Sequence, residues 1–193
     1  MEVQKEVEKH IKEVMRLLEL PITESNKDTP KRVAKMWCKE IFANRNDMHL
    51  EELDASITTF PNEYFTDMVV MRDIPFYSTC EHHFMPFFGT ATVGYIPDET
   101  VVGLSKIPRV VKYFSKRPQI QEQLTEQIGE YLFNKIKPKA IFVYMAGTHT
   151  CVTCRGAESK GVTETFFDHV NTDYAENRTK WRNEFRSRLE YKI

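Results

Sequence analysis

The chain has 193 residues, of which 41% are hydrophobic and 28% charged, and its formal net charge is -1. This length and composition are typical of one globular domain with a real core, and they exclude collagen-like and disordered chains. A net charge near zero gives no overall positive field, so we expect no nucleic-acid partner, and any polyanion must meet a local basic cluster.

The sequence also argues against membrane association. No apolar run approaches the roughly 20 residues that a bilayer-spanning helix needs. The amino terminus mixes acids and bases, and it lacks the apolar stretch and small-residue cleavage site of a secretory signal. We therefore expect a cytoplasmic protein with no membrane partner and a single domain spanning residues 1–193.

Two helices are expected near the amino terminus. Between residues 2 and 20, apolar side chains recur at helical spacing among charges, and Pro21 ends the pattern. A second helix is expected to start at Pro30, because proline favours the first helical position, and to run to about Ala43. A helical region at about residues 1–45 therefore leads into the rest of the domain.

The remainder of the chain predicts strands and helices in alternating groups. Runs of β-branched and aromatic residues between Pro, Gly and Asn predict strands, and apolar residues at four-residue steps predict helices. The expected order is strands at 68–74 and 87–96, helices at 105–116 and 120–136, strands at about 140–153 and 161–170, and a last short helix with Trp181, Phe185 and Leu189 on one side. This order favours an α+β fold with a mainly antiparallel sheet.

Metal-binding residue types are concentrated in two segments, CEHH from Cys80 and HTCVTCR from His149. A closed structural zinc site would use four protein ligands, namely Cys80, His83, Cys151 and Cys154. A catalytic site would use only the first three and leave the fourth position to a water, whose pKa the metal lowers to about 7.

The expected position of Cys154 favours the catalytic interpretation. If the strand continues through this segment, His149, Cys151 and Arg155 share one face while Cys154 points to the other. A turn here would remove this argument, because pairs of cysteines on turns can bind one metal. The shared face would combine a proton-transfer group, a metal ligand and a cation. His82, beside a ligand histidine, is a second candidate acid or base because its ordinary pKa lies near neutrality.

Two basic groups are candidates for binding an anion. Ser105, Lys106 and Arg109 lie within about one turn of the start of an expected helix, where free backbone N–H groups favour negative charge. Arg32 and Lys35 are three residues apart and share one helical face. For either group, a solvated surface is the alternative interpretation.

A further pair, Gln121 and Glu122, opens another expected helix. The carboxylate could accept the ring and amino protons of guanine while the amide meets its carbonyl oxygen. Alternatively, Glu122 is a first-turn carboxylate that stabilises the helix through its dipole.

Five segments, in the right order, resemble the type I GTP cyclohydrolases. These are DTPKRVAKMW from Asp28, RDIPFYSTCEHHFMPFFG from Arg72, VVGLSKIPRVV from Val101, QIQEQLTEQI from Gln119, and HTCVTCRG from His149. The similarity extends from about residue 28 to residue 165, and CEHH with HxCxxxR at this separation is far more specific than a lone Cys-x-x-His pair.

The resemblance implies the tunnelling fold (T-fold), in which an antiparallel sheet carries helices on one face and the sheets of several subunits close a barrel. It implies a homo-oligomer, usually a decamer, with active sites between subunits. It also implies Zn²⁺ as cofactor and GTP as substrate. In the implied reaction, water adds to carbon 8, the imidazole ring opens, formate leaves, and the ribose rearranges and recloses to give 7,8-dihydroneopterin triphosphate.

The resemblance also assigns roles to individual residues. Three match the zinc ligands, namely Cys80, His83 and Cys151. Two match the acid/base histidines, His82 and His149, and Glu122 with Gln121 matches the pair that binds guanine. Residues matching positions around the ribose and triphosphate are Ser105, Lys106, Arg109 and Arg155, while Arg32 and Lys35 match basic residues that reach in from a neighbouring subunit.

The sequence departs from the family at three places. Cys154 stands where many members have methionine, Pro118 stands where leucine is common, and the loop at 156–162 is short. Other interpretations therefore stay open: an enzyme that stops before reclosure, one that uses another divalent metal, or a non-enzymatic nucleotide-binding protein whose closed zinc site includes Cys154. A nitrile reductase of the same fold is less favoured, because CEHH and HxC would then have no purpose.

Overall fold

The computed structural model describes residues 2–190, and its centre is a five-stranded sheet in the order β5-β2-β3-β6-β7. The strands are β2 (Val69–Cys80), β3 (Pro86–Ile96), β5 (Pro118–Gln119), β6 (Ala140–His149) and β7 (Thr163–Val170). Every neighbouring pair is antiparallel except β2 with β5, which is parallel. The prediction of an α+β fold with a mainly antiparallel sheet is confirmed.

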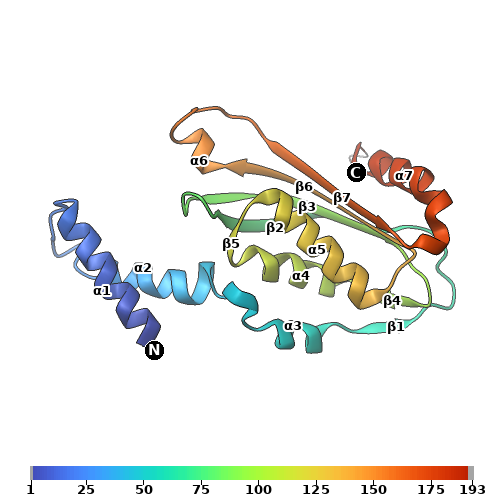
Figure 1. Cartoon of the computed structure of the whole chain (residues 1–193), viewed down its shortest axis with the longest axis horizontal. Coiled ribbons are helices and arrows are strands. Elements are labelled where there is room, and N and C mark those ends of the chain that lie inside the picture. The colour runs from blue at the N-terminus through green and yellow to red at the C-terminus, as the bar shows by residue number, and fades with distance from the viewer. Residues whose placement is uncertain (1, 191–193) are drawn as a thin grey trace.

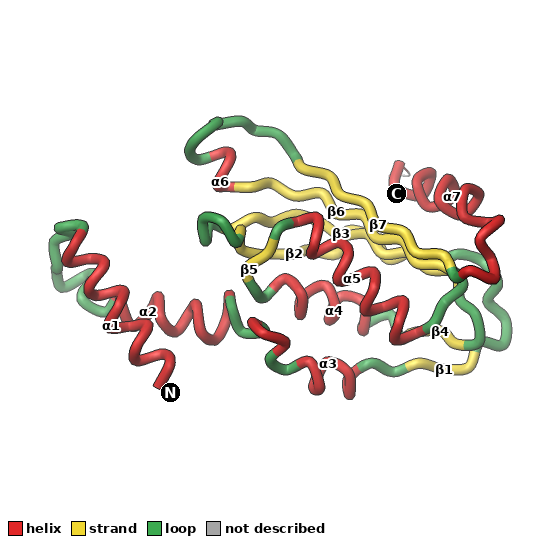
Figure 2. The backbone as a smooth tube through the Cα atoms, in the orientation of Figure 1, coloured by secondary structure: helices red, strands yellow, loops and turns green. Residues whose placement is uncertain are grey.

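Two long helices, α4 (Lys106–Ser115) and α5 (Gln121–Ile136), cover one face of this sheet (Figures 1 and 2). The four-residue steps of α5 turn Leu124, Ile128 and Leu132 inward, where each is completely buried. The predicted layer of helices on one face is therefore confirmed, and it agrees with the tunnelling fold.

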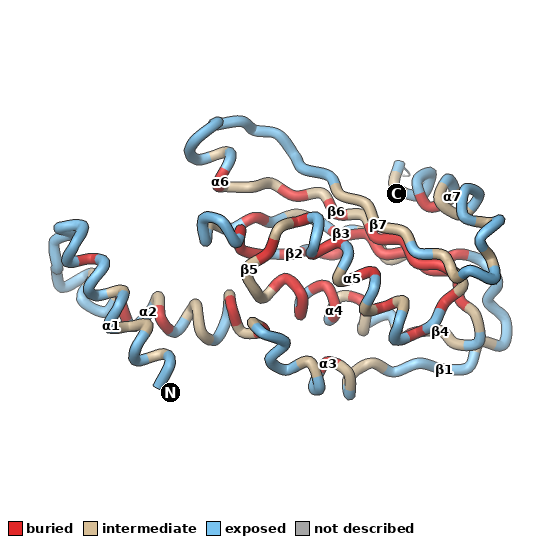
Figure 3. Tube along the Cα trace, viewed as in Figure 1, coloured by how far each residue is buried: buried red, intermediate tan, exposed pale blue. Residues whose placement is uncertain are grey.

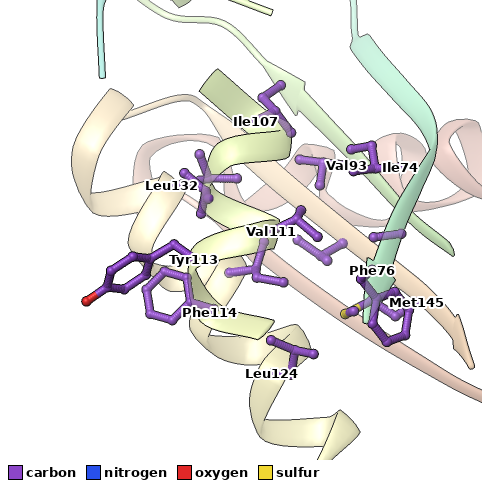
Figure 4. Close-up of a cluster of buried hydrophobic side chains, with 14 of the residues drawn as sticks. Ile74, Phe76, Val93, Ile107, Val111, Tyr113, Phe114, Leu124, Leu132 and Met145 are labelled. Atoms are coloured by element: carbon purple, nitrogen blue, oxygen red, sulfur yellow. The ribbon is translucent and has the colours of Figure 1, made fainter. Parts of the chain in front are cut away.

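The main core lies between these helices and the sheet. Figure 4 shows Val111 of α4 and Leu124 of α5 directed into the same cluster as Phe76 and Met145 of the strands. All four side chains are at most 2% exposed. Burial of such side chains contributes about 1.5 to 3 kcal/mol each, so this layer fixes the sheet whose end carries the site described below.

A further helix, α7 (Arg178–Glu190), packs against the opposite face of the sheet. Its Phe185 is fully buried, with its ring centroid 5.4 Å from that of Phe142 and 6.0 Å from that of Phe166. Gly94 leaves room for this ring, because a Cβ there would lie 2.7 Å from it.

The amino-terminal helices α1 (Glu2–Leu17) and α2 (Thr29–Met36) form an arm that extends beyond one end of the sheet (Figure 1). Figure 3 shows that most of α1 is exposed, whereas buried residues are concentrated in the central strands β3 and β6 and on the inner sides of α4 and α5. The connecting elements are a π-helical turn (Trp37–Ile41), 3-10 turns (Arg45–Asp47 and Thr172–Asn177), α3 (Leu50–Ser56), β1 (Thr59–Pro61) and β4 (Thr100–Val102).

Two expected strand boundaries were wrong. The first strand continues to Cys80, past an irregularity between Met71 and Ile74 that interrupts its pattern. The strand expected to reach residue 153 ends at His149, and the short helix α6 (Thr150–Thr153) follows it. The face assignment that placed Cys154 opposite Cys151 assumed a strand here, so that reasoning fails.

Among residues 2–190, no helix combines the length and the apolar composition that crossing a membrane requires.

Candidate metal centre and active site

The first part of the site is the tight connection between β2 and β3. Cys80 is the last residue of β2, and its backbone N–H donates to the Met85 carbonyl at 2.8 Å while its carbonyl accepts from the Phe84 N–H at 2.9 Å. Phe84 adopts a positive φ of 52° to close this turn. The turn brings His83 back over the strand end, so that its Nδ1 lies 3.7 Å from Cys80 Sγ.

The second part of the site is the end of β6. This strand pairs with β3 as far as His149 opposite Phe87, which places the following α6 beside the β2–β3 connection (Figure 1). The Thr150 hydroxyl donates to the Pro86 carbonyl and ties α6 to the start of β3. Cys151 follows directly and is 9% exposed.

These two parts bring three ligand atoms together. Within the described residues, Cys80, His83 and Cys151 form a group whose ligand atoms all lie within 4.8 Å of one another. Both cysteines are buried, whereas His83 is exposed, so the group faces solvent on one side. Burial raises the pKa of the Cys151 thiol, the adjoining Cys80 thiol adds to this, and Arg155 opposes it. Two sulfurs and one imidazole nitrogen can hold a metal ion, and this donor set fits zinc.

Cys154 lies apart from this group. It is exposed at the end of α6, and its Sγ contacts the Thr153 hydroxyl at 3.7 Å. Residues three apart on a helix share a side, so α6 could have directed both cysteines to one metal. The separation of Cys154 is therefore not a result of strand alternation, because its backbone is helical and its N–H donates to the Thr150 carbonyl.

His149 lies beside the metal group in a half-buried position. Its ring stacks on Phe87, with centroids 4.5 Å apart and planes 6° from parallel, and its Nε2 lies 2.9 Å from Gln121 Oε1. Burial lowers the pKa of His149 below its ordinary value, and the negative charge of Glu122 partly opposes this shift. The Glu122 carboxylate, exposed in the first turn of α5, therefore acts electrostatically on His149.

His82 occupies the exposed side of the same group. Its Nδ1 lies 3.9 Å from Cys80 Sγ, and its Nε2 lies 3.7 Å from the Glu81 carboxylate. The two candidate acid/base histidines thus differ in environment, because His149 is held by two protein contacts whereas the His82 side chain is 63% exposed. Such a difference allows two histidines to perform different proton transfers.

The candidate anion contacts are exposed or half-buried. Ser105 precedes α4 as its N-cap residue and uses no side-chain capping bond, so its hydroxyl is not committed to the helix end. Lys106 and Arg109 follow on the first turns of α4. Arg155 follows α6, four residues after Cys151, and its positive charge favours a lower pKa for the Cys151 thiol.

Arg32 and Lys35 are exposed on α2, in the arm beyond the end of the sheet. The segment after α2 reaches the site through Phe84, the residue that follows His83. The ring centroid of Phe84 lies 6.0 Å from that of Trp37 and 5.4 Å from that of Phe42.

Two residues that support the site at this end of the sheet were not identified from the sequence. Phe87 supports the His149 ring, and Thr150 ties α6 to β3. Neither residue type signals such a role. The register of β3 with β6 could have indicated the Phe87 contact, because opposite residues on antiparallel strands lie about 4.5 to 5.5 Å apart.

Comparisons with known proteins identify the family. The sequence profile of GTP cyclohydrolase I matches residues 7–190. The GTP cyclohydrolase 1 of Sulfurihydrogenibium sp. (strain YO3AOP1) is 49% identical over 142 residues, which are 72% of this chain and 70% of that protein. The GTP cyclohydrolase 1 of Streptococcus mutans serotype c is 45% identical over 163 residues, or 83% of this chain and 82% of that protein.

The GTP cyclohydrolase 1 of Aquifex aeolicus is 43% identical over 157 residues, covering 78% of this chain and 80% of that protein. Since the profile spans nearly the whole described chain and these relatives exceed 40% identity over most of their length, the similarity includes both parts of the site. The chain belongs to the GTP cyclohydrolase I family of enzymes.

Proposed function

We propose that this chain is a zinc-dependent GTP cyclohydrolase that opens the imidazole ring of guanine, releases formate and recloses the product to 7,8-dihydroneopterin triphosphate. The observation that carries this proposal is the convergence of Cys80, His83 and Cys151 within 4.8 Å, in a chain of the GTP cyclohydrolase I family. Three ligands that face solvent on one side suit a catalytic metal, because a catalytic site keeps one position open.

The metal would be held by the Sγ atoms of Cys80 and Cys151 and by one ring nitrogen of His83. Two thiolates and an imidazole suit zinc better than magnesium or calcium, which prefer oxygen ligands. When bound, zinc supplies Lewis-acid activation of water at neutral pH. The hydrogen bond from Thr150 to Pro86 supports the position of Cys151 close to Cys80.

His82 and His149 are proposed to move the protons that ring opening and formate release require. His82 Nδ1 lies 3.9 Å from Cys80 Sγ, and His149 precedes Cys151 by two residues in the chain. The steps involve protons on different atoms of the substrate, and two separate histidines can serve two such atoms.

Glu122 is proposed to bind the guanine ring, since its carboxylate is exposed and can accept from the ring and amino N–H groups. Ser105, Lys106, Arg109 and Arg155 would bind the ribose and triphosphate. Together with Glu122 on α5, these residues lie on α4 with its N-cap residue and on the segment after α6, so substrate binding would depend on the helix layer as well as on the sheet.

The assembly is also part of the proposal. We propose a homo-oligomer, with ten subunits as in the family resemblance, whose sheets close a barrel and whose active sites lie between subunits. Arg32 and Lys35 would then reach the triphosphate of a neighbouring site, which accords with their place on an arm that extends beyond the sheet. The chain would act in the cytoplasm as one domain with its helical region at about residues 1–45.

The test is incubation of the zinc-loaded protein with GTP, following pterin fluorescence and formate together. Both products in equal amounts would support full conversion, whereas formate without a fluorescent product would indicate an enzyme that stops before reclosure. ATP serves as the control nucleotide. Equal use of ATP would remove the reason for placing guanine against Glu122, because sites built around such hydrogen bonds discriminate strongly.

A further inference from the structure

Gln121 occupies a buried position beside the site, and its side chain is fully engaged with the protein. It is 1% exposed, although it is the first residue of α5. Its Nε2 lies 2.9 Å from the Thr163 carbonyl oxygen, 3.2 Å from the Met145 carbonyl oxygen and 3.1 Å from Thr165 Oγ1. Its Oε1 lies 2.9 Å from His149 Nε2. This amide therefore connects β6, β7 and the candidate histidine.

The chemistry of these partners fixes the orientation of the amide. Carbonyl oxygens can only accept hydrogen bonds, so the atom that faces Thr163 and Met145 must be the NH₂ group. The reversed amide would place one oxygen against two others. Oε1 consequently faces His149, and since an amide oxygen can only accept, the proton between them belongs to His149 Nε2.

A small hydroxyl network supports the same orientation. The Thr125 hydroxyl donates to the Gln121 backbone carbonyl at 2.7 Å, which uses its single proton. The Thr165 hydroxyl, 2.6 Å away, must then donate to Thr125 and can accept from Gln121 Nε2. Nε2 has two protons for its three acceptors, so one of these contacts is shared, and the other hydrogen-bond directions around the ring are consistent. A buried network with consistent directions is rigid.

The surroundings also hold the His149 ring in place. Phe87 stacks on it at 4.5 Å, which sets the plane of the imidazole. Gly147, two residues earlier on β6, leaves space for the amide, because a Cβ there would lie 2.5 Å from Gln121 Oε1. A glycine at this position thus permits the hydrogen bond that determines which ring nitrogen carries the proton.

We propose that Gln121 is a positioning residue that holds His149 as the Nε2-protonated tautomer and leaves Nδ1 as the nitrogen that exchanges a proton with the substrate. Gln121 would thereby act through His149, while guanine recognition falls to Glu122. The part that concerns substrate rests on the proposed function. The tautomer itself is a property of the substrate-free protein and can be measured without any turnover.

The first experiment is ¹⁵N NMR of the zinc-loaded protein with labelled histidine, at about pH 8.5, where a free imidazole is neutral. The chain has 6 histidines, and the His149 signals are assigned by their loss in His149→Gln. We expect a protonated Nε2 and an unprotonated Nδ1 for His149. The opposite tautomer, or an equal mixture of both, would overturn the proposal without using any enzymatic assay.

The second experiment compares Gln121→Met with Gln119→Met. Both glutamines are 1% exposed, but Gln119 bonds to the Phe114 carbonyl and to Gln127 and is two residues from Gln121 in the chain. Gln121→Met should keep zinc, lose the single tautomer, and lower kcat at least about tenfold with KM for GTP within about threefold. Gln119→Met should lower the melting temperature comparably and keep both tautomer and kcat.

Three results would contradict the positioning role: an unchanged tautomer in Gln121→Met, an equal loss of kcat in Gln119→Met, or a raised KM with normal kcat, which would indicate direct guanine binding. If Gln121→Met fails to fold, Gly147→Ala displaces the amide while keeping Gln121 itself, and the same loss of a single tautomer is expected. A protein with the expected tautomer that does not convert GTP would refute the proposed function and leave the tautomer assignment of His149 standing.

Discussion

Each of the three proposed ligands supplies one atom, so the group has no spare protein ligand that could replace a lost one. Cys80→Ser, His83→Ala and Cys151→Ser are each expected to lose both the metal and turnover, because two protein ligands rarely retain zinc. Metal content by atomic spectroscopy and GTP turnover should fall together. A variant that kept full zinc and full turnover would show that its residue is not a ligand.

The two candidate proton-transfer histidines should behave differently from the ligands. His82→Ala and His149→Ala are expected to keep zinc and to lose about 10² to 10⁴ in rate, the usual contribution of a general acid or base. One of them is expected to accumulate a ring-opened formamide, since opening needs fewer proton transfers than full conversion. Mass spectrometry after incubation with GTP would detect it. Loss of zinc from both variants would require a new ligand set.

Cys154 offers a test of the open coordination position. It is exposed and outside the three-residue group, so Cys154→Met should leave zinc near one atom per chain and leave the number of sulfur ligands seen by X-ray absorption unchanged. A drop in metal content, or one sulfur fewer around zinc, would instead support the closed structural site that uses this cysteine.

At the scale of elements, the short helix α6 decides where Cys151 lies. The Thr150 hydroxyl donates to the Pro86 carbonyl of β3. The Thr153 hydroxyl lies on the same helix, and within the described residues its hydrogen-bond contact is with its chain neighbour Cys154. Thr150→Val should therefore weaken zinc binding by about tenfold, as is usual for residues that orient a ligand. A competition assay with a chelator measures this, with Thr153→Val as the control. Equal effects of the two changes would argue against a specific tie.

How well the elements could be predicted depended on how regular their patterns are. The four-residue steps of α5 and the β-branched run of β3 gave nearly correct bounds, because each repeats one period over ten or more residues. The helix α6 was missed because Thr-Cys-Val-Thr is rich in β-branched residues, which favour strands. The helix begins where the pairing of β6 with β3 ends at His149. The end of this pairing depends on tertiary structure and cannot be read from the local sequence.

The same limit applied to the site. The spacing in CEHH and HTCVTC gave four candidate ligands, and the family resemblance selected the three that converge, Cys80, His83 and Cys151. The burial of Gln121 was not predicted, because nothing in its local sequence separates an exposed first-turn residue from one enclosed by two strands. Met145 and Thr165 both contact the Gln121 amide, and they lie opposite each other only because of the register between β6 and β7.

At the scale of the whole molecule, two surfaces formed by residues 2–190 are not covered by other described parts of the chain. β7 is an edge strand that pairs only with β6 in the described sheet, and edge strands readily pair with another chain. The arm exposes apolar side chains, with Leu17 and Leu18 at 64% and Ile22 at 57%. Apolar surface of this kind commonly marks a contact with another subunit. Both features support the proposed oligomer, in which neighbouring chains would cover them.

If active sites lie between subunits, two inactive variants should restore one another. The candidate chemistry at Cys80, His83 and His149 belongs to one chain, whereas Arg32 and Lys35 on the arm are proposed to serve a neighbour. His149→Ala mixed with the double variant Arg32→Ala/Lys35→Ala, by joint refolding in equal amounts, should rebuild intact sites at about a quarter of positions. Turnover at low GTP should then exceed that of either variant alone.

The matched control is His149→Ala mixed with Cys80→Ser. Both changes lie in the part of the site that one chain supplies, because Cys80 ends β2 and His149 ends β6, the two strands that flank β3 in the same sheet. No mixing of these two variants can create an intact site, so turnover should stay at the sum of the separate proteins. Recovery only in the first mixture would place Arg32 and Lys35 in a neighbour's site. Absence of recovery in mixtures shown by mass spectrometry to contain both chains would confine each site to one subunit.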